Sequence, residues 1–211
     1  IEPIQGEGGV IPGKKAFFSE LRKICNKKKT LLIFDEVQSG VGRTGKMWGY
    51  ENLNIEPDGF TLAKGLGGGH PIGALLVNNK ANIFSPGDHA STFGGNPFAC
   101  TAALTVLEEI NRRDLLNNVL VRGKQLENGL NTLSKEYSNI INCQRGLGLL
   151  KGIVLKEEVI DAKTITLKAF EKGLLVVPAG GNVVRIVPPL IISNNEIKSI
   201  LKKLSLIFRE I

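Results

Sequence analysis

The chain has 211 residues, of which 42% are hydrophobic and 22% are charged, a balance typical of a globular protein with a real core. No apolar run is long enough to cross a bilayer, and no secretory leader opens the sequence, so we expect a cytoplasmic protein with no membrane partner. The net charge of +7 is spread over helical surfaces without a basic motif interleaved with aromatic residues, so no nucleic-acid partner is expected. The three cysteines are scattered and predict neither a metal site nor a disulfide framework.

Strand and helix patterns alternate along the first half of the chain, and a smaller set follows a change of character near residue 115. The predicted strands lie at residues 30–34, 60–63, 73–77, 140–144, 149–155, 174–177 and 183–187. The predicted helices begin after Pro12-Gly13, at Pro97 behind Asn96, near Val119, at about Ala162, and before Ile197. These patterns predict an α/β fold with a three-layer part and a mostly parallel sheet over residues 1–115. A small α+β domain is expected over residues 116–211.

Two carboxylates, Asp35 and Glu36, follow the buried strand at 30–34. Ligands of α/β sheets bind beyond the carboxyl ends of the strands, so this position suits a binding site. The spacing alone leaves two alternatives open. The carboxylates could cap a turn, or the strand could bind magnesium in a nucleotide-binding ATPase, although no GxxxxGK[ST] phosphate loop is visible in this sequence.

Lys64 ends the strand at 60–63 and is followed by glycines at 65, 67, 68 and 69. An ordinary solvated lysine is the simplest interpretation. The apolar approach and the glycine run argue against it, because glycines let the backbone press against a flat or bulky group. Desolvation favours the neutral amine, which is the form that makes a Schiff base with an aldehyde.

Ser91 and Thr92 precede a glycine pair at the predicted start of a helix. Hydroxyl groups beside a helix N-terminus suit an anion. Asn96 alone is sufficient as the helix N-cap, so capping leaves Ser91 and Thr92 unexplained.

These motifs together resemble the class III (ornithine-type) pyridoxal-phosphate-dependent aminotransferases. In the order of the family they are Glu-Pro-Ile-Gln-Gly-Glu-Gly-Gly at 2–9, Phe-Asp-Glu-Val-Gln-Ser-Gly-Val-Gly-Arg-Thr-Gly at 34–45, Ala-Lys-Gly at 63–65, Ser-Thr-Phe-Gly-Gly-Asn-Pro at 91–97 and Arg-Ile-Val-Pro-Pro-Leu at 185–190. The resemblance implies the C-terminal part of the large domain of the type I fold of these enzymes over 1–115, and their small C-terminal domain over 116–211. It also implies a homodimer with shared active sites.

Two segments, 42–51 and 87–93, are most similar to the class members that transfer the amino group of N2-acetylornithine to 2-oxoglutarate. The resemblance therefore implies small-molecule amino-acid and 2-oxo-acid substrates. Ornithine, succinylornithine and 4-aminobutyrate stay open as alternative amino donors.

The resemblance assigns cofactor-binding roles to residues of two motifs. Lys64 would hold pyridoxal phosphate covalently and later move a proton. Asp35 would pair with the pyridine nitrogen and keep it protonated, so that the ring withdraws electrons. Gln38 would hydrogen-bond the phenolic oxygen of the ring, and Glu36 and Val37 would belong to the same cofactor-binding segment.

The remaining roles concern the substrate and the second subunit. Thr92 would reach the cofactor phosphate of the other subunit, and Ser91 would lie beside the substrate. Arg185 would bind a substrate α-carboxylate in bidentate fashion. Glu7 would pair with Arg185 when no carboxylate should occupy it, whereas a turn carboxylate is the alternative for Glu7. Glu2 would have a supporting role.

Several parts of the family's active site lie before the equivalent of Glu2. These are the glycine-rich phosphate loop, the aromatic side chain that stacks on the ring, and an arginine for the acyl-ornithine carboxylate. The 211-residue chain alone is therefore expected to be inactive. Trp48 and Tyr50 would line the entrance or pack on the dimer partner, and His89 is expected to be a loop residue.

Overall fold

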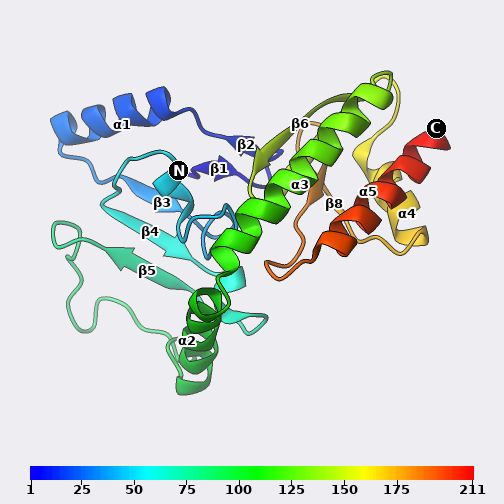
Figure 1. Ribbon diagram of the computed structural model, residues 1–211. Helices are drawn as coiled ribbons and strands as arrows, with labels where there is room; N and C mark the ends of the chain where they lie inside the picture. The colour runs from blue at the N-terminus through cyan, green and yellow to red at the C-terminus, as the bar shows by residue number, and fades with distance from the viewer. The chain divides into compact units, whose positions relative to one another are not determined.

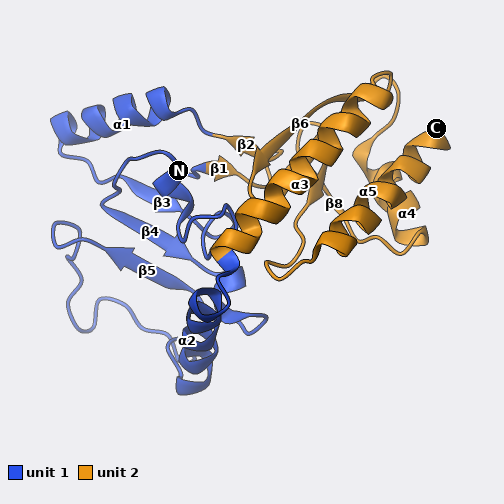
Figure 2. Ribbon diagram, viewed as in Figure 1, with its two compact units in different colours: residues 1–3, 13–115 blue, residues 4–12, 116–211 orange.

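The computed structural model describes residues 1–211, which divide into two compact units (Figure 2). The first unit comprises residues 1–3 and 13–115, and the second comprises residues 4–12 and 116–211. No helix combines the length and the apolar run that a bilayer crossing requires. The expected single boundary near residue 115 did not anticipate that segment 4–12 belongs to the second unit.

Residues 4–12 form a short hairpin that packs against the second unit. β1 (Ile4–Gln5) and β2 (Ile11–Pro12) pair in antiparallel fashion, and the hairpin buries Ile4 and Val10 in a cluster with Leu150 and Val183 of the second unit. The burial of apolar side chains, rather than proximity in sequence, therefore assigns the hairpin to the second unit.

The first unit is built on a three-stranded sheet in the order β3–β4–β5 (Figure 1). Its elements are α1 (Lys15–Lys28), β3 (Ile33–Asp35), the 3₁₀ turns η1 (Gly49–Asn52) and η2 (Lys64–Gly67), β4 (Gly59–Leu62), β5 (Ala74–Val77) and α2 (Pro97–Arg112). β3 and β4 are parallel, whereas β4 and β5 are antiparallel. The α/β class is as predicted, and the sheet is mixed because the connection from β4 to β5 contains no crossover helix that could return the chain in parallel.

Helix α1 covers the sheet through a narrower stripe than the sequence predicted. Phe18 and Cys25 are buried with Leu32 and Phe34, but Phe17 and the neighbouring Ile24 are more than half exposed. Helix α2 begins as predicted. The Asn96 side chain accepts a hydrogen bond from the backbone N–H of Ala99 (2.9 Å), and Pro97 occupies the first turn.

The second unit is a four-stranded antiparallel sheet in the order β6–β7–β9–β8, together with three helices. Its elements are α3 (Leu115–Glu136, of which Leu115 is assigned to the first unit), β6 (Ile141–Leu147), β7 (Leu150–Leu155), α4 (Ala162–Glu171), β8 (Val177–Ala179), β9 (Val183–Ile186) and α5 (Asn194–Arg209). The strand predicted at 174–177 starts only at Val177, because residues 174–176 form the exit from α4 after a left-handed glycine at 173.

The two faces of this sheet have different neighbours. Val184 and Ile186 of β9 pack into one core with side chains of α3, α4 and α5, whereas Val183 packs with the β1–β2 hairpin. Since side chains alternate along a strand, Arg185 belongs to the hairpin face together with Val183. The arginine that the sequence singled out is therefore on the face that also receives residues 4–12.

Candidate active site

Asp35 and Lys64 lie at the same end of the first unit's sheet, where the parallel strands β3 and β4 finish. Asp35 is in register with Thr61 on the parallel strand, and the backbone N–H of Glu36 donates to the Thr61 carbonyl (3.0 Å). Lys64 starts the η2 turn, two residues beyond the last residue of β4. The carboxyl ends of two neighbouring parallel strands thus present a carboxylate and an amine at the edge where α/β sheets bind ligands.

Lys64 adopts a backbone conformation that is unusual for a side chain of its size. Its φ angle is +47°, in the left-handed region, which costs about 1–3 kcal/mol for a residue other than glycine. Its side chain is exposed, so this chain does not supply the desolvation that the sequence analysis expected. Strain retained at an exposed lysine is an indication of function, because folding alone would favour glycine here.

The loop that carries Gln38 packs onto the end of β4 and the start of η2. A Cβ atom at Gly40 would come within 3.0 Å of the Leu62 side chain, and one at Gly65 would lie 3.9 Å from the Val41 side chain. Gln38 itself is half-buried. The loop after β3 and the turn after β4 are therefore in contact, which brings the segment of Gln38 to the edge occupied by Lys64.

Asp35 uses one of its oxygens to hold its own turn. Its Oδ1 atom accepts a hydrogen bond from the backbone N–H of Val37 (3.0 Å), and the side chain is exposed. Asp35 therefore caps a turn with one carboxylate oxygen, as the turn-capping alternative predicted, and the rest of its carboxylate is accessible.

The neighbouring carboxylate of Glu36 is buried and fully engaged by the loop. Its Oε2 atom accepts from the Ser39 hydroxyl (2.6 Å) and the Gly49 N–H (2.8 Å), and its Oε1 atom accepts from the Tyr50 N–H (2.6 Å). Burial raises the pKa of Glu36, and these hydrogen bonds offset only part of that effect. The carboxylate of Glu36 thus anchors the loop that carries Gln38, and the cofactor-binding role expected for Glu36 stays a prediction.

Ser91 and Thr92 lie in the exposed segment between β5 and α2. The Ser91 hydroxyl accepts a hydrogen bond from the backbone N–H of Gly94 (3.0 Å). Ser91 therefore stabilises a turn, which is a structural reason for a serine at this position that helix capping did not provide. Ser91 and Thr92 are both exposed. Their predicted roles beside the substrate and the cofactor phosphate stay predictions.

The aromatic residues that the sequence left open pack within the first unit. The ring centroid of Phe60 lies 5.1 Å from that of Trp48 and 5.4 Å from that of Tyr50, and Tyr50 also stacks on Phe34. His89 is an exposed loop residue.

The predicted pair of Glu7 and Arg185 is present in the second unit. An Arg185 guanidinium nitrogen lies 2.8 Å from a Glu7 carboxylate oxygen, and the exposed fractions of the two side chains are 11% for Arg185 and 67% for Glu7. A buried cation is therefore neutralised by an accessible carboxylate. The use of this pair in substrate exchange stays a prediction.

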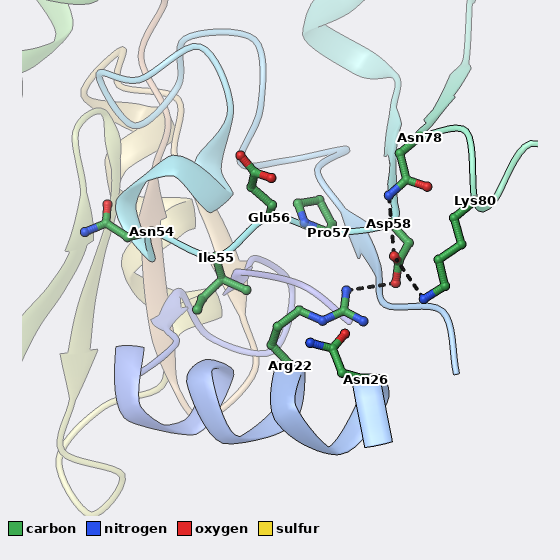
Figure 3. Close-up of a pocket in the computed structure, with 9 residues that line it drawn as sticks. All are labelled: Arg22, Asn26, Asn54, Ile55, Glu56, Pro57, Asp58, Asn78 and Lys80. Carbon is green, nitrogen blue, oxygen red and sulfur yellow. Dashed lines mark hydrogen bonds and ion pairs between the residues drawn. The ribbon is translucent and has the colours of Figure 1, made fainter. Parts of the chain in front are cut away.

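A hollow of about 460 Å³ lies at the other end of strands β3 and β4, beside the residues that precede β4 (Figure 3). In its lining, Asp58 accepts hydrogen bonds from the Leu32 N–H (2.8 Å), Arg22 (2.8 Å) and Asn78 (3.4 Å), and the Lys80 amine lies 3.6 Å away. Burial alone would raise the pKa of Asp58, but these donors outweigh it and lower the pKa to about 2. Sequence reasoning did not single out Asp58, which stands before a strand with no motif around it. Its saturated contacts fit a structural role.

The groups at the carboxyl edge fit pyridoxal phosphate in chemical type. An accessible carboxylate suits a protonated ring nitrogen, an amide suits a phenolic oxygen, and an exposed amine suits an aldehyde carbon. Asp35, Gln38 and Lys64 supply one of each.

The family described as Aminotransferase class-III matches residues 1–208, which is nearly the whole chain. The chain belongs to this family. Membership decides between the alternatives left open by Asp35 and Glu36 in favour of the aminotransferase, not the nucleotide-binding ATPase.

Curated relatives agree with this family and indicate a closer group. The chain is 74% identical over 210 residues to an acetylornithine aminotransferase of Prochlorococcus marinus subsp. pastoris, covering 100% of this chain and 51% of that protein. It is 57% identical to an acetylornithine aminotransferase of Parasynechococcus marenigrum, covering 100% of this chain and 50% of the relative. The chain thus spans about half the length of the curated relatives it matches.

Solved structures show the same fold. Ornithine aminotransferase from Plasmodium yoelii superimposes with a TM-score of 0.93 at 35% identity, over 100% of this chain and 56% of the other. N-acetylornithine aminotransferase from Stenotrophomonas maltophilia gives a TM-score of 0.87 at 37% identity, over 99% of this chain and 55% of the other. The α/β fold predicted from the sequence is therefore that of these aminotransferases.

Proposed function

We propose that this chain is part of an enzyme that transfers the amino group of N2-acetylornithine to 2-oxoglutarate in arginine biosynthesis. The products would be N-acetylglutamate 5-semialdehyde and glutamate. The convergence of Asp35, Gln38 and Lys64 at one strand edge carries the proposal, and the 74% identity to a relative named acetylornithine aminotransferase supports the choice of substrate.

Pyridoxal phosphate, when bound, supplies an electron-withdrawing ring that stabilises negative charge at the substrate Cα. The amine of Lys64 would hold the cofactor and would move the proton at the substrate Cα. The Asp35 carboxylate keeps the ring nitrogen protonated. Gln38 orients the ring through its phenolic oxygen.

The second unit would select the substrate through Arg185. A guanidinium binds a carboxylate in bidentate fashion, which suits the α-carboxylate of glutamate and 2-oxoglutarate. Leaving this buried cation without a partner is costly, so Glu7 neutralises it during the half-reaction with the acylated ω-amino donor. Glu7 and Arg185 would act as a gate that opens for one substrate and closes for the other.

The two units would correspond to the C-terminal part of the large cofactor-binding domain and to the small C-terminal domain of the family. The enzyme would be a cytoplasmic homodimer with shared sites, in which Thr92 reaches the cofactor phosphate of the other subunit and Ser91 lies beside the substrate. Large apolar side chains near these residues are highly exposed, as a covered interface requires: Ile83, Phe84, Phe93 and Phe98. The free cysteines fit a reducing compartment.

Covalent labelling tests the role of Lys64. The protein, expressed at the length of its relatives and loaded with pyridoxal phosphate, is reduced with borohydride, digested and mapped by mass spectrometry. We expect a pyridoxyl group on Lys64 and none on Lys46, an accessible matched lysine of the same unit. A label absent from Lys64 in a cofactor-loaded protein would overturn the proposal.

Substrate competition tests the choice of amino donor. We expect kcat/KM for N2-acetylornithine to exceed the values for ornithine, succinylornithine and 4-aminobutyrate. A higher value for one of these three would keep the aminotransferase chemistry and replace the donor.

A further inference from the structure

Arg145 and Arg185 face the same short turn from two strands of the second unit's sheet. Arg145 of β6 is in register with Gly152 of β7, and Gly152 is in register with Arg185 of β9. Residues directly opposite one another on neighbouring strands share a face, so both arginines lie on the hairpin face. They are two strands apart, about 10 Å at the usual spacing of strands.

The turn of residues 6–10 lies over this row. A Cβ atom at Gly152 would come within 3.1 Å of the Val10 side chain, so the missing side chain at 152 makes room for the turn. Arg145 donates from Nε to the carbonyl of Gly9 (2.8 Å), and Arg185 pairs with the carboxylate of Glu7 (2.8 Å). The two guanidinium groups therefore hold the two ends of one turn.

The backbone at Gly9 packs closely against its neighbours. Gly9 has a φ of +113°, and a Cβ atom there would lie 2.4 Å from the Gly180 carbonyl and 2.8 Å from the Arg145 guanidinium. The backbone N–H of Gly180 donates to the Glu7 carbonyl (2.8 Å). The exposed side chain of Glu7 can move without disturbing these contacts.

We propose that Arg145 is a positioning residue for the gate: it fixes the backbone of the 6–10 turn so that the Glu7 carboxylate returns to Arg185. The inference rests on the proposed gate of Glu7 and Arg185. Arg145 contacts a carbonyl, not the Glu7 carboxylate, so it stays in place when Glu7 leaves. When the anchor is absent the turn samples more conformations, Glu7 occupies Arg185 for less of the time, and an incoming carboxylate competes with it more easily.

The test compares four single variants and one double variant of the protein, expressed at the length of its relatives and loaded with cofactor. Arg145→Met keeps the apolar stem and removes the donor, Arg145→Lys restores a donor, and Glu7→Gln removes the charge of the gate. Arg122→Met is the matched control, because Arg122 is a half-buried arginine of the same unit that donates to Gln125 within its own helix. Glutarate, a dicarboxylate that cannot react, is the probe, and its Kd is measured by calorimetry.

We expect Arg145→Met to tighten glutarate binding about two- to tenfold, the range that corresponds to one hydrogen bond. KM for glutamate should fall by a similar factor at unchanged kcat, KM for the ω-amino donor should stay constant, and the Gly180 amide should exchange its hydrogen faster. Arg145→Lys should restore part of each value. Arg122→Met should change none of them.

The double variant Glu7→Gln/Arg145→Met separates this inference from the gate itself. If Arg145 acts through Glu7, the double variant binds glutarate no more tightly than Glu7→Gln alone. An unchanged Kd in Arg145→Met, or an effect that persists in full beside Glu7→Gln, would overturn the positioning role and leave the gate intact. An unchanged Kd in Glu7→Gln would overturn the gate, and the inference with it.

Discussion

An aspartate lies at each end of the parallel strands of the first unit's sheet, and the surroundings of the two aspartates differ. At the amino end of β4, Asp58 accepts bonds from Leu32, Arg22 and Asn78 and is almost fully buried. At the carboxyl end of β3, Asp35 is exposed and bonds the turn beside it, near a lysine with a strained backbone.

The difference teaches how to separate structural from functional polar groups. A carboxylate whose hydrogen bonds are satisfied inside the fold contributes to stability and has little left to offer a ligand. A carboxylate and an amine that stay accessible at a strand end contribute little to stability and are available for chemistry. The hollow beside Asp58 has a definite volume, yet the more open edge is the one that suits catalysis.

Replacing Lys64 would sharpen this contrast most. Lys64→Ala removes the amine that is proposed to hold the cofactor and move the proton, so we expect transamination to fall about a thousandfold or more. The melting temperature should stay within a few degrees, since the side chain is exposed. Steady-state kinetics and calorimetry measure both, and near-normal turnover would remove Lys64 from the site.

Replacing Asp35 by its neutral isostere should affect activity without affecting the fold. Asparagine can still accept the bond from Val37, but it cannot hold a proton on a ring nitrogen. We expect kcat to fall about a hundredfold or more, the scale of one preorganised electrostatic contact. Loss of stability without loss of kcat would reverse the interpretation of this edge.

The same change at Asp58 should have the opposite outcome. Asp58→Asn leaves Arg22 without its charged partner, and we expect the free energy of unfolding to drop by about 3 kcal/mol. Because the pKa of Asp58 is lowered from 3.8 to about 2 in the folded state, its stabilisation is present above pH 4 and is lost as the pH falls towards 2. Urea titrations from pH 2 to pH 7 should show this loss in the wild type and not in the variant.

Glu36→Gln should give the smallest effect, about 1–2 kcal/mol, because an amide offers one oxygen to donors that now use two. The pKa of Glu36 is raised by burial, so its contribution to stability is complete below its usual pKa of 4.5 and declines as the pH rises through its folded pKa. The difference between wild type and variant should therefore shrink with rising pH. A difference that grows would mean that the ionised form is the one the loop prefers.

Much of the fold followed from local patterns. The start of α2 was predictable from Asn96 and Pro97 because an N-cap and a first-turn proline act within one helical turn. The antiparallel β5 was not, since a short apolar strand has the same pattern in either direction. The exchange of residues 4–12 depends on burial against distant strands, which no local pattern reports.

The candidate site was predictable in its residue types and less so in its geometry. The motifs pointed to Asp35, Gln38 and Lys64, but the strained φ of Lys64 and the buried anchoring of Glu36 depend on contacts between separate loops. In the proposed homodimer, the positions of Ser91 and Thr92 relative to a cofactor would depend on the second subunit. The spacing of residues along one chain does not show which residues would meet across two subunits.

The hairpin of residues 4–12 has a practical consequence for dissecting the molecule. The polypeptide passes from one unit to the other three times, near residues 3, 12 and 115, so no single cut yields two intact halves. Residues 116–211 produced alone would uncover Leu150 and Val183, which the hairpin now shields, and would invite self-association. A circularly permuted or linker-joined gene that restores residues 4–12 would be needed to isolate the second unit.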